Sequence, residues 1–95
     1  MYQSAINAVS HVTGIPEADF LSPSRKWEYV EARMLLTLLL HREGVVDQRI
    51  ADVIRRQRPT VTVLRHKAED VIAYSSSLSL KLKKVLKAYE DRQSI

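Results

Sequence analysis

The chain has 95 residues, which is enough for one domain and too few for two independent hydrophobic cores. Its size excludes a catalytic α/β barrel, a two-domain dehydrogenase and an ATP-driven motor. The absence of cysteine excludes disulfides, zinc ribbons and thiol nucleophiles. The longest apolar-rich run, residues 34–40, is far shorter than the roughly 20 residues that cross a bilayer. With no secretory signal at the N-terminus, we expect a cytoplasmic protein that is not bound to a membrane.

The net charge of +4 is unevenly distributed along the chain. Residues 1–52 carry five basic and seven acidic side chains, whereas residues 53–95 carry ten basic and four acidic ones. No acidic residue lies between Asp52 and Glu69, a stretch that holds four arginines and one lysine. A one-sided positive potential favours a polyanion, with nucleic acid first and an acidic membrane or protein surface second. The structural alternative is a solvated basic face.

Two glycines and three prolines supply too few turn residues for an all-β fold, and the apolar spacing predicts helices throughout. The first helix is expected over residues 3–13 and ends at Gly14. Pro16 should open a second, short helical turn over residues 17–21. The apolar anchors of these two elements are Ile6, Val9, Val12, Phe20 and Leu21.

A long helix is expected from Ser24, as its N-cap, to about Glu43. Gly44 should end it, because glycine adopts at little cost the left-handed conformation that commonly follows a helix. The apolar residues of this segment lie widely enough around the helix to make it the central, most buried element. They are Trp27, Val30, Met34, Leu35, Leu38 and Leu39.

Residues 47–74 have the outline of a helix-turn-helix motif. Asp47 should cap a short helix, a basic connection follows at residues 55–58, and Pro59 should occupy the first position of the next helix. The residues expected to face inward in this pair are Ile50, Val53, Ile54, Val61, Leu64, Ala68, Val71 and Ile72.

A break at the serines of residues 75–77 precedes the last expected helix, over about residues 78–91. Its inward residues are Leu78, Leu82, Val85 and Tyr89. Its lysines, 81, 83, 84 and 87, form either a solvated face or a supplementary phosphate contact. The sequence therefore predicts one all-α domain over residues 1–95, with five to six helices.

The basic residues at the start of the second motif helix suit DNA recognition. A helix-turn-helix places its second helix in the major groove, while the first crosses the backbone. Arginines at that helix start can bind O6 and N7 of guanine, and others can pair with phosphates. The helix N-terminus adds free N–H groups for a phosphate. Residues 47–74 therefore predict binding of double-stranded DNA.

Three segments resemble motifs of a known family. They are residues 14–22, which read Gly-Ile-Pro-Glu-Ala-Asp-Phe-Leu-Ser, residues 31–36 with Ala32-Arg33, and residues 56–61, which read Arg-Gln-Arg-Pro-Thr-Val. From about Ala5 to Val85 the chain is similar to the C-terminal DNA-binding domain of the bacterial replication initiator DnaA. The resemblance implies a DnaA C-terminal or Trp-repressor-like fold. It also implies a module that lacks an ATPase domain, because no glycine-rich phosphate loop is present in the chain. Met1 fits a free-standing protein.

The resemblance also implies which residues contact DNA. Arg56, Thr60 and Val61 agree with the family's Arg-Asp-His-Thr-Thr-Val signature, whereas Gln57, Arg58 and Pro59 differ from it. The candidates for base contact are Arg56, Gln57, Arg58 and Thr60. The candidates for contact with the DNA backbone are Arg25, Lys26, Arg33, Arg55, Arg65 and Lys67. For Arg33 the alternative is a structural role.

A protein-interaction module is the competing interpretation. A relative that has lost part of the signature can keep the scaffold and bind a replication protein through its basic face without reading DNA. An enzyme is not expected. The pairs His41–Glu43 and His66–Asp70 lack a third metal ligand, and no histidine lies near the serines of residues 75–77. We therefore expect no catalytic residue, no metal and no cofactor, and the sequence leaves the oligomeric state open.

Overall fold

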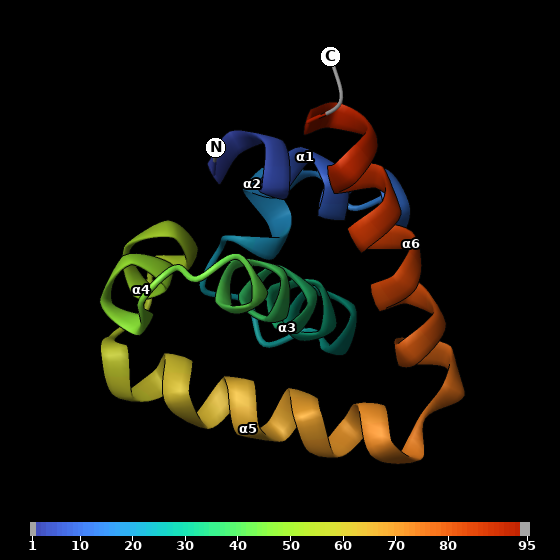
Figure 1. Cartoon of the computed structure of the whole chain (residues 1–95). Helices are drawn as coiled ribbons and strands as arrows, with labels where there is room; N and C mark the ends of the chain where they lie inside the picture. The colour runs from blue at the N-terminus through green and yellow to red at the C-terminus, as the bar shows by residue number, and fades with distance from the viewer. Residues whose placement is uncertain (1, 94–95) are drawn as a thin grey trace.

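The computed structural model describes residues 2–93, which form six α-helices and no strand. The helices are α1 (Tyr2–Thr13), α2 (Glu17–Phe20), α3 (Trp27–Arg42), α4 (Asp47–Ile54), α5 (Arg58–Tyr74) and α6 (Ser76–Gln93). They pack into a body of 34 × 28 × 24 Å (Figure 1). The prediction of an all-α fold with five to six helices is confirmed.

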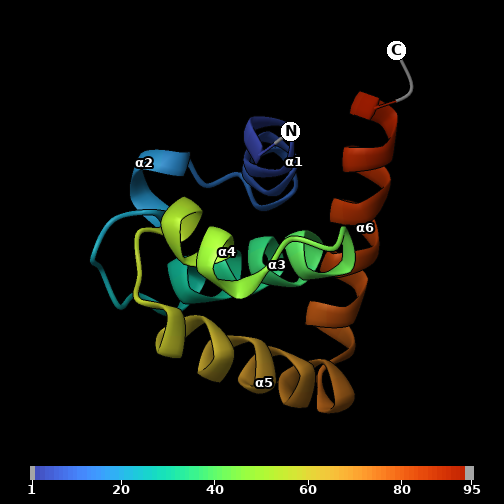
Figure 2. The same ribbon diagram turned by 60° about the vertical axis from the view of Figure 1, so that its left-hand side comes forward.

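Helix α3 is the centre of the fold, and the other five helices all pack against it (Figure 2). Residues 32–37 are all buried, as are Leu39 and Leu40, so that every side of the helix is covered. The predicted central position of this helix is confirmed. Because α3 contacts every other helix, one buried cluster of apolar side chains joins all six elements.

Two helices distant in sequence, α1 and α6, pack against each other on one side of α3, and α5 runs along another side (Figure 1). Val9 of α1 and Leu78 and Val85 of α6 are fully or almost fully buried. Between helices, Gly14 and Gly44 have φ angles of +73° and +83°. Both glycines therefore end helices in the left-handed conformation that was expected of them.

Several helix boundaries differ from the prediction. Helix α3 begins at Trp27 and not after Ser24, whose hydroxyl instead accepts a hydrogen bond from the Lys26 amide at 3.2 Å. Trp27 was placed in the buried set, but it is 48% exposed, since it lies in the first turn where α3 emerges from the core. Asp47 is the first residue of α4 and does not cap it, and the N-cap is Val46.

The remaining boundary differences concern α5 and α6. Arg58 takes the first position of α5 and Pro59 the second, where a missing N–H is equally harmless. Only Ser75 breaks the chain before α6, because its hydroxyl accepts a hydrogen bond from the Leu78 amide at 3.2 Å and so caps a helix that starts at Ser76.

Candidate nucleic-acid interface

Helices α4 and α5 form a pair joined by a three-residue turn, residues 55–57. Ile50, Ala51 and Ile54 of α4 and Val61 and Ala68 of α5 are buried. Figure 1 shows α4 nearly end-on while α5 runs across the view, so the two helices cross steeply. The pair therefore has the helix–turn–helix arrangement that the apolar spacing predicted.

The turn depends on Arg55 in a left-handed backbone conformation, with φ 59° and ψ 45°. The Arg56 amide donates to the Ala51 carbonyl at 2.9 Å and the Arg55 amide to the Asp52 carbonyl at 3.4 Å. These two bonds make a Schellman cap, whose left-handed position glycine usually fills. A non-glycine residue there is strained by roughly 1 kcal/mol or more. The chain therefore keeps a positive side chain in the turn at the expense of stability.

The Arg55→Gly variant should unfold at a higher urea concentration than the wild type, with a gain of about 1 kcal/mol from the relieved strain. Urea denaturation followed by circular dichroism measures this effect. Arg55→Ala, which removes the charge and keeps the strained conformation, is the control. A destabilised glycine variant would contradict the assignment of strain.

The N-terminus of α5 is open. Its N-cap, Gln57, makes no side-chain capping hydrogen bond, so the first amides of the helix are left to solvent or to a ligand. Gln57, Arg58 and Thr60 are all exposed there, as the prediction of base contacts requires. Farther along α5, Val63 is 67% exposed.

Asp47 holds α4 against α5. Its Oδ2 atom accepts hydrogen bonds from the Thr62 hydroxyl at 3.1 Å and from Arg65 Nη2 at 3.2 Å. Burial opposes ionisation of this carboxyl, but the hydrogen bonds from Arg65 and Thr62 and the charge of Arg65 outweigh burial and lower its pKa. The ion pair and the Thr62 hydrogen bond fix the position of α5 relative to α4.

The lowered pKa of Asp47 makes the stability of the fold depend on pH in a defined direction. A carboxyl whose pKa is lower in the folded state stabilises the fold above its unfolded pKa, about 3.9, and this contribution is lost as the pH falls further. Asp47→Asn should therefore destabilise the protein by about 1 kcal/mol at pH 7, and the difference from wild type should shrink below about pH 4. Urea denaturation at several pH values measures it. Asp70→Asn, an exposed change on α5, is the control, and a difference that does not vary with pH would refute the role of the charge.

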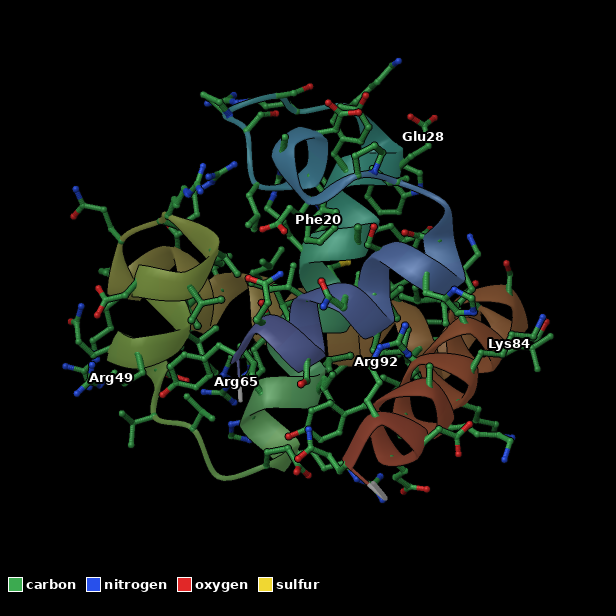
Figure 3. The ribbon with its side chains drawn as sticks, turned by 90° about the horizontal axis from the view of Figure 1, so that it is seen from above. Phe20, Glu28, Arg49, Arg65, Lys84 and Arg92 are labelled. Atoms are coloured by element: carbon green, nitrogen blue, oxygen red, sulfur yellow. The ribbon has the colours of Figure 1, made fainter. Side chains whose placement is uncertain are left out.

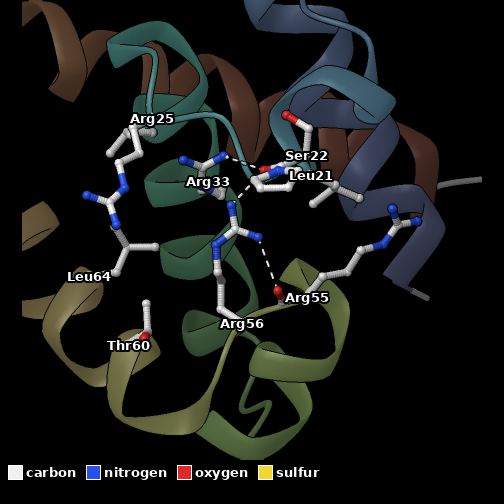
Figure 4. Close-up of a pocket in the computed structure, with 10 residues that line it drawn as sticks. Leu21, Ser22, Arg25, Arg33, Arg55, Arg56, Thr60 and Leu64 are labelled. Carbon is white, nitrogen blue, oxygen red and sulfur yellow. Dashed lines mark hydrogen bonds between the residues drawn. The ribbon is translucent and has the colours of Figure 1, made fainter.

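Two arginines bind the loop between α2 and α3 to the rest of the fold. Arg33 donates to the carbonyl oxygens of Phe20, Ser22 and Ser24 at 2.8, 3.3 and 2.8 Å. Arg56 donates to the same Ser22 carbonyl at 2.6 Å and, through Nη1, to those of Ile54 and Arg55 (Figure 4). Burial and the nearby charge of Arg56 lower the pKa of Arg33.

These contacts correct three of the predicted DNA contacts. Arg33 is only 5% exposed, so it has the structural role and not the phosphate contact. The Arg65 side chain is 17% exposed and paired with Asp47, and it lies inside the outline of the molecule, whereas Arg49 projects outward (Figure 3). Arg56 is partly buried, and its guanidinium is held by three carbonyl groups, so it does not extend to a base edge.

The other predicted backbone residues are exposed. Arg25 and Lys26 lie in the loop before α3, Arg55 in the turn, and Lys67 on α5. Lys67 Nζ lies 5.7 Å from the centre of the Trp27 ring, and Lys26 Nζ lies 5.5 Å from that of Tyr29. A cation over an aromatic ring is held in place without losing its charge, so both lysines stay available to an anion.

A cleft of about 620 Å³ separates the loop at residues 21–25 from the α4–α5 turn. Arg25, Arg33, Arg55 and Arg56 line it together with Thr60 near the start of α5, and no acidic residue is among its lining residues (Figure 4). The sequence did not predict this cleft, because the loop and the turn that form its two walls are 30 or more residues apart in the chain.

Neither a metal site nor a membrane span is found in residues 2–93. No group of three or more histidine, aspartate or glutamate side chains there could hold a metal ion, and none of these helices is long and apolar enough to span a membrane. No protein-family model, curated protein or solved structure matches the chain.

Proposed function

We propose that the protein binds double-stranded DNA, with the N-terminal part of α5 in the major groove. The observation that carries the proposal is the group of unpaired cations around the open start of this helix. Arg58 is exposed there, and the adjacent cleft is lined by arginines and by no carboxylate. Positive charge at an open helix N-terminus is the arrangement that binds phosphate groups.

The exposed side chains divide into two sets. Gln57, Arg58 and Thr60 lie in the turn and first turn of α5, where side chains reach base edges. Arg25, Lys26, Arg55 and Lys67 flank this helix start and suit contacts to phosphates.

The residue motifs shared with the DnaA family support a more specific proposal. The protein is then a DnaA-like, cytoplasmic regulator of replication or transcription. The replaced signature residues Gln57, Arg58 and Pro59 favour a second candidate, in which the basic face binds a replication protein and not DNA. Measured binding to DNA separates the two candidates.

The experiment is fluorescence anisotropy with a labelled duplex of random sequence and a duplex that holds the DnaA recognition box. We expect binding at about 50 mM salt that weakens steeply by about 200 mM, with a log–log slope of about −4 or steeper, as four or five neutralised phosphates require. Preference for the box would favour a role in replication. No binding to either duplex at the lower salt would reject DNA as the ligand and favour the protein partner.

A further inference from the structure

The cleft between the α2–α3 loop and the α4–α5 turn carries positive charge that nothing in the described residues neutralises. Four arginines reach it from three segments: Arg25 from the loop, Arg33 from α3, and Arg55 and Arg56 from the turn. The ion pairs among residues 2–93 involve Arg65, Lys81 and Lys87 and none of these four arginines. The cleft is therefore a concentration of unpaired positive charge.

Two of the four guanidinium groups converge on one neutral acceptor. Arg33 Nη1 and Arg56 Nη2 both donate to the Ser22 carbonyl oxygen, at 3.3 and 2.6 Å. A carbonyl satisfies their hydrogen bonds but supplies only a partial negative charge, so two adjacent full charges remain. Charges removed from water in this way are usually paired with an anion. Their arrangement favours a negatively charged ligand.

The other two arginines have the freedom to contact such a ligand. Arg25 and Arg55 are exposed, and no hydrogen bond holds their guanidinium groups in the described structure. Figure 4 shows Arg25 reaching down from the loop toward α5 while Arg56 reaches up to Ser22. The Thr60 side chain adds a hydroxyl donor to the lining near the open start of α5.

We propose that this cleft is an anion site that binds one phosphate group. The fixed fork of an arginine matches phosphate oxygens, and several such forks face one space. Arg25 and Arg55 bind the group directly, whereas Arg33 and Arg56 supply fixed charge behind it. The bound phosphate joins the α2–α3 loop to the motif turn and so orients the start of α5. That its occupant is a DNA backbone phosphate rests on the proposed function, whereas binding of the group itself does not.

Inorganic phosphate is the probe for the site alone. We would titrate it into ¹⁵N-labelled protein at constant ionic strength, with chloride as the exchanged ion, and follow amide and arginine Nε resonances. Saturable shifts are expected at residues 22–25 and 55–60. Arg25→Gln and Arg55→Gln should each weaken the affinity by about threefold or more, and Arg49→Gln, which removes an exposed charge that does not line the cleft, should not. Shifts that do not saturate, or that Arg25→Gln leaves unchanged, would overturn the proposal.

A second arm identifies the source of the phosphate. An unlabelled duplex should abolish the phosphate-dependent shifts at residues 22–25 if a DNA phosphate occupies the cleft. Saturable phosphate binding that DNA does not displace would confirm the anion site and assign it to a free phosphate. DNA binding without saturable phosphate shifts would overturn the site and leave the proposed function standing. Phosphate binding in a protein that binds no duplex would confirm the anion site and reject the proposed function.

Discussion

Replacing Arg33 with methionine should destabilise the protein by about 3 kcal/mol, although the arginine lies on the central helix among apolar neighbours. Methionine keeps an unbranched apolar side chain, which ends two atoms short of the terminal guanidinium nitrogens, and removes the charge whose burial is unfavourable. It also removes the donor to the carbonyl groups of Phe20, Ser22 and Ser24. Leaving partly buried carbonyl groups without donors raises the free energy of the folded state by more than removing the buried charge lowers it. The net effect is therefore a loss of stability.

Urea denaturation followed by circular dichroism measures this loss. Arg49→Met is the matched control, since Arg49 is exposed on α4 and projects into solvent (Figure 3). Arg33→Lys should lie between wild type and Arg33→Met, because one ammonium group cannot reach three carbonyl groups in different directions. Amide exchange of residues 20–26 should accelerate in Arg33→Met. A stability equal to that of the control would contradict the structural role of Arg33.

Arg58→Ala should weaken binding to the preferred DNA sequence by about 1–3 kcal/mol, which is roughly 5- to 150-fold, and should relax sequence preference. Arg58 is the first residue of α5 and is exposed, so truncation should leave the fold intact. The physical reason is the loss of a bidentate contact to a base edge. Selection from random duplexes supplies the preferred sequence, and anisotropy then compares it with a random duplex.

Lys67→Ala is the control for this prediction. Lys67 is also exposed on α5, but an ammonium group at a phosphate carries no sequence information, so its loss should weaken all duplexes by the same factor. Arg58→Lys should resemble Arg58→Ala on the preferred sequence, since lysine keeps the charge but loses the planar fork. An equal loss on preferred and random duplexes for Arg58→Ala would refute base reading by Arg58.

The motif helices could be predicted from sequence because local physics defines them. Ile50 and Ile54 lie one turn apart on α4, and both are buried. The fixed φ angle of Pro59 favours a position in the first turn of a helix, which here is α5. Gln57, Arg58 and Thr60, which the resemblance named, are exposed at the start of α5. The boundary errors at α3 and α6 arose because a serine can cap a helix or stabilise a loop, and its hydroxyl bonds to nearby amides in both cases.

The charged residues could not be placed from sequence in the same way. Sequence spacing puts Arg65 on the flank of α5, but only the steep crossing of α4 and α5 brings Asp47 within 3.2 Å of it. Trp27 fits an apolar stripe, yet it is 48% exposed at the first turn of α3, where Lys67 of α5 lies over its ring.

Periodicity, glycine and proline act within a few residues, and they therefore define the all-α fold, the central helix and the turn between α4 and α5 without knowledge of the packing. The inward orientation of Arg33 and Arg56, with Arg25 and Arg55 unpaired beside them, depends on the packing of segments far apart in the chain. The reason is that carbonyl groups in an irregular loop need donors, and these donors come from side chains 9 to 34 residues away. Which long side chain meets that need depends on how the helices pack.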